Sequence, residues 1–414
     1  MTATDKIRLA KKASAAVARA NTLQKNAALK AIAEHLVSHT GDIMTANQLD
    51  LERGLAEGIS SGLIDRLRLD EARIASLADA VLQVAALADP VGDVKRGMTL
   101  ANGLRLNQVA VPFGVVGAIY EARPNVTIDI AALALKSGNA VVLRGGSATE
   151  NTNLLLVSIL QKAVASAGLP ADAIQSVDDF GRQGAVEMMQ ARGLIDVLVP
   201  RGSAGLIKAV VEESKVPVLE TGDGVVHIFV DASARQDWAV EIVHNSKVQR
   251  PSVCNALETL LVHQDAAAST LPAILMRLSE SGVTIHADEA TRAIFDGAVE
   301  ATEEDWKAEY YSLDLAVKIV ADLDEALEHI AKYSTHHTES IITEDISNAE
   351  RFLQEVDSAV VMVNAATRFT DGGEFGFGAE VGISTQKLHA RGPMGLAELT
   401  STKWLVRGEG QTRV

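Results

Sequence analysis

Cysteine is nearly absent from this sequence, since Cys254 is the only one among the 414 residues. A single thiol excludes a disulfide within the chain and is typical of a reducing compartment. Long apolar runs are missing too, because none reaches the roughly 18 residues that a membrane-spanning helix needs. The first 21 residues mix charged side chains with alanines and lack the apolar core of a secretory signal. We therefore expect a cytoplasmic protein.

Positive charge is also scarce, with 38 Lys and Arg against 54 Asp and Glu and a net charge of −16. Because nucleic-acid binding requires clustered cations, we expect no nucleic-acid partner. The cations that are present fall largely in predicted loops, which favours a small anionic ligand at strand ends, although any single loop arginine is more often simply solvated. These residues are Arg123, Arg144, Arg201, Arg250, Arg368, Lys387 and Arg391.

Two common ligand signatures are missing. No GxGxxG follows the first predicted strand, so the ordinary dinucleotide fingerprint is absent. Segment 202–205 places small residues at a predicted helix start, where backbone N–H groups can meet a phosphate, but a plain tight turn is the more frequent reason for such a sequence. His336 and His337 are adjacent and their side chains point apart, so we predict no metal site there.

Hydrophobic periodicity divides the chain into regions. Residues 1 to about 90 are rich in Ala and Leu with helical spacing, which predicts several helices. From Gln108 onward strands and helices alternate, which predicts a doubly wound, mostly parallel sheet, and a second such unit begins near Val225. Ligands of these sheets bind beyond the carboxyl ends of the strands, where Arg144 and Arg201 fall. The predicted strands are 114–120, 140–143, 176–178 and 197–199, then 225–230, 259–262, 283–286, 316–320, 340–343 and 360–364.

We therefore expect an α/β protein with two doubly wound parallel-sheet domains and an extended ribbon. Residues 1–224 would form the cofactor-binding domain, 225–364 the catalytic domain that carries Cys254, and 365–414 a segment that returns to the first domain and the ribbon. The stretches 94–111 and 401–407 are the ribbon candidates. Because a ribbon that leaves the core has edges that need partners, we expect a homo-oligomer.

The surroundings of Cys254 predict a reactive thiol. Lys247 and Arg250 precede it, and Pro251 opens an apolar run suited to the start of a helix. A thiol in the first turn of a helix, beside a cation, is held as a thiolate at neutral pH. The alternative is a small buried core residue, which is what most single cysteines are.

Six segments together carry a family resemblance, namely 111–127, 135–146, 199–203, 250–256, 375–385 and 389–396. In this order they resemble the aldehyde dehydrogenase superfamily. The strings 121–125 and 389–393 resemble in particular the branch that reduces γ-glutamyl phosphate. The resemblance implies an aldehyde-dehydrogenase-like fold, with the ribbon used for oligomerisation.

The same resemblance implies roles for individual residues. Cys254 matches the nucleophile of the family, and Asn125 matches the amide that forms the oxyanion hole with the backbone N–H of the cysteine. Arg144 stands where relatives place a Lys against the adenosine ribose, and Ser147 stands where NAD-preferring relatives often carry a Glu. A cation without that acid suits a 2′-phosphate, so NADPH is the expected cofactor.

Four further positions have counterparts in the family, and one of them, Glu220, departs from the family in meaning. Gly202 and Ser203 match the turn near the pyrophosphate, and Glu309 matches the acid that holds the nicotinamide ribose. Glu220 aligns with the base that activates water in oxidising relatives, but an acyl-phosphate reductase needs no such water, so we assign it no firm role.

The implied reaction is the NADPH-dependent reduction of L-glutamyl 5-phosphate to L-glutamate 5-semialdehyde in proline biosynthesis, through a thioester on Cys254. Because the substrate carries a carboxylate and a phosphate, cations must converge on it; Arg368, Lys387 and Arg391 are the candidates, with Arg201 and Arg250 behind them. The alternatives are a CoA-dependent acylating or an oxidising aldehyde dehydrogenase, and a non-catalytic binding protein. Physical association with an upstream glutamate 5-kinase stays open.

Overall fold

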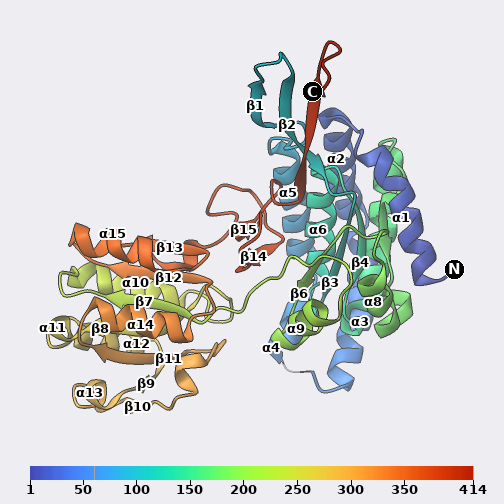
Figure 1. Ribbon diagram of the computed structural model, residues 1–414. Helices are drawn as coiled ribbons and strands as arrows, with labels where there is room; N and C mark the ends of the chain where they lie inside the picture. Colours follow the sequence, from blue (N-terminus) through green and yellow to red (C-terminus); the bar gives the residue numbers. More distant parts are fainter. Residues whose placement is uncertain (60, 414) are drawn as a thin grey trace. The chain divides into compact units, whose positions relative to one another are not determined.

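The computed structural model describes residues 1–59 and 61–413, and the chain forms two compact units (Figure 1). Unit 1 comprises Met1–Thr221, Gly376–Gly382 and Met394–Val414, and unit 2 comprises Gly222–Phe375 and Ile383–Pro393. The predicted return segment 365–414 is thus divided between the units, since 365–375 and 383–393 belong to unit 2. The chain passes from unit 2 to unit 1 twice in its last 40 residues. Local hydrophobic periodicity does not predict these two crossings.

Unit 1 opens with the helices that the Ala- and Leu-rich region predicts. Side-chain caps fix several of their starts: Thr2 forms a capping box with Asp5, and Asn21 forms one with Gln24. Each of the longer helices buries one face. The five helices are α1 (Ala3–Val17), α2 (Thr22–Ser38), α3 (Thr40–Ala56), α4 (Ser61–Leu67) and α5 (Glu71–Ala86).

The core of unit 1 is a four-stranded parallel sheet in the order β5-β4-β3-β6, as the alternating pattern predicts. Strand β5 begins two residues before the predicted segment 176–178 and ends at Ser176, because Asp178 already starts a 3-10 turn and accepts a 2.6 Å hydrogen bond from Gly145 N–H. The strands are β3 (Val115–Tyr120), β4 (Ala140–Arg144), β5 (Ile174–Ser176) and β6 (Val197–Arg201). The helices that alternate with them are α6 (Pro124–Lys136), α7 (Glu150–Ser166), α8 (Gly181–Gln190) and α9 (Ala204–Glu213).

Unit 1 also carries a three-stranded antiparallel sheet, β1 (Val94–Thr99), β2 (Arg105–Pro112) and β16 (Thr400–Arg407), in the order β1-β2-β16. The predicted pairing of 94–111 with 401–407 is therefore present. Strand β1 is exposed along its whole length, and β16 is largely exposed. A role for this sheet in assembly stays a prediction.

Unit 2 is built on a seven-stranded sheet in the order β10-β9-β11-β8-β7-β12-β13, and its neighbouring strands run parallel to one another. Its strands are β7 (Val226–Val230), β8 (Leu257–His263), β9 (Thr284–Ala287), β10 (Val299–Glu300), β11 (Asp314–Val320), β12 (Thr338–Ile342) and β13 (Val360–Val363). The helices are α10 (Gln236–Val248), α11 (Gln264–Ala267), α12 (Leu271–Glu280), α13 (Glu289–Arg292), α14 (Leu323–Tyr333) and α15 (Ile346–Glu355).

Two hydrophobic clusters hold helices to this sheet. One contains residues of α10 and α12, such as Val243 and Leu275, and the other contains Ile330 of α14 and Phe352 of α15. A separate two-stranded sheet joins β14 (Gly382–Ser384) and β15 (Gly392–Met394). None of the helices in the described part of the chain is long and apolar enough to cross a membrane.

Candidate active site

Cys254 lies in a turn between α10 and β8, half-buried, and not in a helix as the sequence predicted. Helix α10 ends at Val248 and the buried strand β8 starts at Leu257. The few residues between them make turns and bends, so no helical N-terminus is available to stabilise a thiolate at Cys254. The predicted helix was wrong because the apolar run after the cysteine belongs to a central strand.

Residues 367–370 hold the Cys254 turn in place through hydrogen bonds. Asn255 donates its side-chain amide to the carbonyl of Thr370 (2.8 Å), and Thr367 Oγ1 donates to the carbonyl of Asn255 (2.8 Å). Gly224 packs against the turn so closely that a Cβ atom there would lie 1.6 Å from the Cys254 carbonyl oxygen. The thiol is therefore carried by a fixed backbone, as a nucleophile requires.

Of the two cations that precede Cys254, Lys247 is committed elsewhere. Its ammonium donates to Glu258 Oε2 at 2.6 Å, and both side chains are fully buried. Burial raises the pKa of Glu258 and lowers the pKa of Lys247, while their mutual attraction opposes both shifts. Lys247 thus stabilises a carboxylate beneath the turn and is not the cation that the sequence suggested for the thiol.

Arg368 is a cation whose backbone touches the Cys254 turn, because the Asn255 side-chain amide donates to its carbonyl at 3.4 Å. Burial lowers the pKa of this half-buried guanidinium, as does the charge of Arg250, whereas Asp371 and the Cys254 thiol raise it. Its Nε donates to Gln249 Oε1 at 2.7 Å, which fixes its direction. Arg250 and Arg368 therefore supply positive charge around the nucleophile, a setting that favours the thiolate.

The buried Lys247–Glu258 pair gives a stability prediction. Changing Lys247→Met leaves Glu258 buried without its partner, which should lower the free energy of unfolding by about 3–5 kcal/mol. Because burial raises the pKa of Glu258 above its unfolded value, protonation relieves part of this loss at low pH, and the deficit grows as the pH rises. Urea unfolding at several pH values measures it. The double variant Lys247→Met/Glu258→Leu should recover most of the loss, and a single variant as stable as the parent at high pH would contradict the interpretation.

Glu309 and Tyr311 lie near the same thiol. Tyr311 donates its hydroxyl to Glu309 Oε2 at 2.6 Å, and its backbone has a φ of 57°, a region that a bulky residue adopts only when its surroundings hold it there. Burial, the hydrogen bond to Glu309 and then nearby acids, with Cys254 last, raise the pKa of Tyr311. Glu309 Oε1 is buried and has no hydrogen-bond partner among the described residues. Glu309 is thus held by Tyr311 in a largely buried position.

In unit 1, Asn125 is held by a residue that the sequence analysis missed. Asn125 follows Pro124 in the first turn of α6 and donates its side-chain amide to Asp129 Oδ2 at 3.1 Å, one turn further on. Burial raises the pKa of Asp129 to about 6, although the bond from Asn125 and the charge of Arg201 lower it. One amide hydrogen of Asn125 is thus used for orientation and the other can serve a ligand. The i, i+4 spacing was the available signal.

The proposed pyrophosphate turn also shows an acid that the sequence did not reveal. Ser203 caps α9 with its hydroxyl, and its backbone N–H donates to Glu121 Oε2 at 3.0 Å. A Cβ atom at Gly202 would lie 2.6 Å from the same oxygen, so the glycine permits this close approach. The start of α9 is therefore occupied by a carboxylate of the chain itself, which a pyrophosphate would have to displace.

Arg144 and Ser147 lie where β4 ends. Arg144 is half-buried and its Nε donates to the Gly181 carbonyl at 3.4 Å, whereas Ser147 is exposed at the start of a 3-10 turn. The two remaining substrate candidates, Lys387 and Arg391, both pair with Asp357, the latter at 2.9 Å. Their shared carboxylate offsets their charge, which makes Arg368 the stronger candidate.

Glu220 is half-buried near the end of the long N-terminal segment of unit 1, and its place there does not assign it a role. Within the described residues, no group of three or more His, Cys, Asp or Glu side chains is suited to hold a metal ion.

The chain belongs to the aldehyde dehydrogenase family, whose profile matches residues 2–293. Within this family it is similar to the gamma-glutamyl phosphate reductases of Leifsonia xyli subsp. xyli and Clavibacter michiganensis subsp. michiganensis, each 64% identical to it. These alignments span 410 and 404 residues and cover 99% and 98% of this chain, and 97% and 94% of the respective relatives. The resemblance that the sequence motifs predicted is confirmed.

Solved structures agree. The crystal structure of gamma-glutamyl phosphate reductase from Thermotoga maritima is 46% identical, covers both chains completely and superposes with a TM-score of 0.98. An acetylating aldehyde dehydrogenase from Geobacillus thermoglucosidasius is 18% identical, with coverage of 100% of this chain and 97% of its own, and a TM-score of 0.72. That more distant likeness concerns the fold alone. The predicted aldehyde-dehydrogenase-like α/β fold is confirmed.

Proposed function

We propose that this protein reduces L-glutamyl 5-phosphate to L-glutamate 5-semialdehyde with release of phosphate, using NADPH, as a step of proline biosynthesis. The observation that carries the proposal is the fixed, half-buried Cys254 in a turn that contacts the backbone of Arg368, in a chain 64% identical to gamma-glutamyl phosphate reductases. An acyl phosphate is a substrate that a thiolate can attack without an acid to assist the leaving group.

The chemistry of the cysteine proceeds in balanced steps. The Cys254 thiolate attacks the acyl carbon, a C–S bond forms, and the C–O bond to phosphate breaks with its electron pair on the departing phosphate. NADPH, when bound, supplies the hydride that reduces the resulting thioester. The tetrahedral oxyanion then collapses, the C–S bond breaks, and the aldehyde leaves as the thiolate is restored. No water is activated in these reaction steps, so the mechanism does not require Glu220 as a base.

Asn125 and the arginines stabilise the negative charges of this reaction. By the family's pattern, the free amide hydrogen of Asn125, oriented by Asp129, would be one donor to the developing oxyanion and the backbone N–H of Cys254 another; one such donor is worth about 3 kcal/mol in comparable sites. Arg368, with Arg250, binds the anionic ends of the substrate. Lys387 and Arg391 are weaker candidates because Asp357 offsets their charge.

The residues that would hold the cofactor are divided between its two ends. Glu309 would accept a hydrogen bond from the nicotinamide ribose, and Gly202 and Ser203 would meet the pyrophosphate at the start of α9 in place of the Glu121 carboxylate. Arg144 and Ser147 would contact the adenosine ribose and its 2′-phosphate.

The assay that tests the function runs in the reverse direction. With glutamate semialdehyde and NADP⁺, NADPH formation should depend on inorganic phosphate, because only phosphate releases the acyl group as an acyl phosphate. Activity that needs CoA instead would identify an acylating aldehyde dehydrogenase, and activity without either nucleophile would identify an oxidising one. For a non-catalytic protein, alkylation of Cys254 should be no faster than that of a model thiol.

The cofactor assignment gives a separate prediction. Changing Arg144→Glu should raise the KM for NADPH by about 10- to 100-fold, because a charge-assisted bond to the 2′-phosphate is replaced by repulsion. The KM for NADH should change much less, since NADH has no such phosphate. Steady-state kinetics with both nucleotides measure the difference, and equal effects on the two would refute the assignment.

A further inference from the structure

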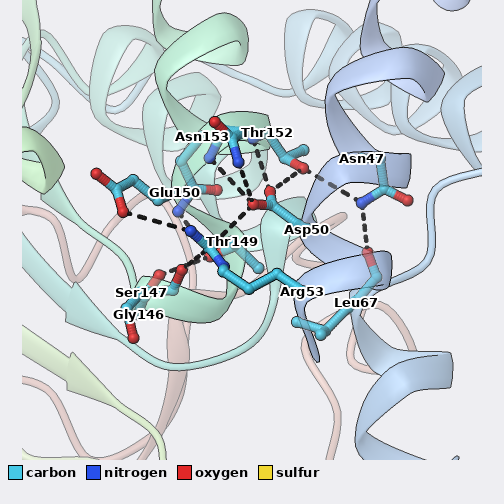
Figure 2. A network of polar contacts seen from close by, with 11 residues as sticks. Asn47, Asp50, Arg53, Leu67, Gly146, Ser147, Thr149, Glu150, Thr152 and Asn153 are labelled. Carbon is cyan, nitrogen blue, oxygen red and sulfur yellow. Dashed lines mark hydrogen bonds and ion pairs between the residues drawn. The ribbon is translucent and has the colours of Figure 1, made fainter. Parts of the chain in front are cut away.

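A buried carboxylate on α3 organises the chain next to the proposed 2′-phosphate position (Figure 2). Asp50 is fully buried, and its two oxygens accept hydrogen bonds from the first residues of α7. Oδ1 accepts from the backbone N–H and the side-chain amide of Asn151 (3.2 and 2.9 Å), and Oδ2 accepts from the backbone N–H and the hydroxyl of Thr152 (2.8 and 2.6 Å). Asp50 thus caps a helix to which it is distant in sequence.

Arg53, one turn after Asp50, links this carboxylate to the turn that follows β4. Its Nη2 donates to Asp50 Oδ1 at 2.9 Å and also to the carbonyl oxygen of Ser147. Its Nη1 lies 3.7 Å from Glu150 Oε2, beyond hydrogen-bond distance. Figure 2 shows the guanidinium between Asp50, Glu150 and the turn containing Ser147.

The exposure of these groups decides which of them a ligand can reach. The side chain of Asp50 is 0% exposed, whereas that of Arg53 is 33% exposed and that of Glu150 is 40% exposed. Ser147 is exposed as well. The guanidinium therefore faces solvent beside the same turn that would carry the nucleotide's adenosine end, with hydrogen-bond donors on Nη1 to spare.

We propose that Arg53 determines the specificity for the nucleotide. It holds Ser147 in place and binds the 2′-phosphate of the nucleotide together with Arg144. The inference rests on the proposed function, because it assumes that the β4–α7 turn binds the adenosine ribose. A planar guanidinium suits a phosphate because it offers parallel N–H donors.

Local charge supports the same conclusion. Asp50 and Glu150 place two carboxylates at this turn, and Arg53 is the cation in contact with both. Without Arg53, a phosphate dianion would approach Asp50 and Glu150 without the cation that pairs with both. Loss of Arg53 should therefore weaken binding of a 2′-phosphorylated nucleotide far more than binding of one without that phosphate.

The test compares NADPH with NADH in Arg53→Ala and Arg53→Gln. Glutamine carries no charge and its amide is two bonds shorter than the guanidinium, so it removes the phosphate contact while keeping more of the local packing than alanine does. Urea unfolding and titration of NADPH fluorescence of both variants measure folding and nucleotide binding separately from turnover. Both variants should raise the KM for NADPH by about 10- to 100-fold, the range expected for one charge-assisted contact. The KM for NADH should rise much less, only through the weaker hold on Ser147, and the kcat at saturation should stay close to that of the parent. Inhibition by 2′-AMP should weaken in parallel, and inhibition by 5′-AMP should not.

Arg73→Ala is the matched control, because Arg73 is a partly exposed arginine of α5 that binds Asp65 and nearby carbonyls in the same helical region. It should leave both KM values unchanged. If Arg53→Gln keeps the parental KM for NADPH, or if both nucleotides are affected equally, Arg53 only supports the fold and the inference is wrong. If the parent itself shows no preference for NADPH, and Arg144→Glu affects both nucleotides alike, the proposed cofactor assignment has failed instead.

Discussion

Turnover is expected to fall by at least about 10⁴-fold when Cys254 is replaced by alanine, because the variant has no nucleophile to receive the acyl group. NADPH binding should be unchanged, since the residues proposed to hold it are elsewhere in the chain. Single-turnover reduction of glutamyl phosphate measures the first effect, and titration of NADPH fluorescence measures the second.

Mass spectrometry of the parent protein provides the complementary test. Incubated with glutamyl phosphate and no reduced nucleotide, the protein should gain the mass of one glutamyl group on the peptide that contains Cys254, and the alanine variant should gain none. Substantial reductase activity in the alanine variant, or an adduct at another residue, would exclude the covalent mechanism proposed above.

The second large effect is expected at Gly224, a residue without any chemical function. A methyl group there would lie 1.6 Å from the carbonyl oxygen of Cys254, 2.5 Å from its carbonyl carbon and 2.9 Å from its Cα. All three are backbone atoms, so no flexible side chain can move aside. Gly224→Ala should displace the Cys254 turn and lower kcat by about 100-fold or more, the scale of a 1 Å misplacement. It should also lower the free energy of unfolding by about 1–3 kcal/mol, as overpacking does.

Gly41→Ala is the control for this substitution. Gly41 lies in the first turn of α3, and a Cβ atom there would meet nothing within 4 Å. Its replacement should leave kcat unchanged. Steady-state kinetics together with urea unfolding of both variants separate a displaced nucleophile from a general loss of stability. A Gly224→Ala variant with the kcat and stability of the parent would show that the contact is not as tight as the structure indicates.

Sequence patterns predicted the fold well where a strand is buried on both faces, because such a strand is a continuous apolar run. Strands such as β4 (Ala140–Arg144) and β11 (Asp314–Val320) are apolar runs between turn residues, and the sequence located each of them. The helix expected at Pro251 was wrong for a related reason. An apolar run that follows a proline suits a helix or a buried strand equally, and only the neighbouring strands of the sheet decide between them.

The candidate site was predictable to the extent that it depends on single residue types. Cys254 stands out because it is the only thiol. The partners that orient the site could not be found in the same way, because they are brought in by the fold: Glu258 neutralises Lys247, and Glu121 reaches Ser203 from 82 residues away. Because such residues are charged, the sequence predicts that they lie on the surface, and the neighbouring residues do not show which of them is paired.

The antiparallel sheet of unit 1 also has a consequence for how the protein is made. Strand β16 pairs along β2 from Thr400 with Pro112 to Arg407 with Arg105, and the buried amide of Asn139 donates to the Leu399 carbonyl at 2.9 Å. During synthesis, β2 leaves the ribosome long before β16 is translated, so one of its edges stays open for most of that time. Such an edge can recruit strands of other nascent chains. Chaperone dependence and yield should therefore respond to changes in the last strand even when the mature enzyme tolerates them.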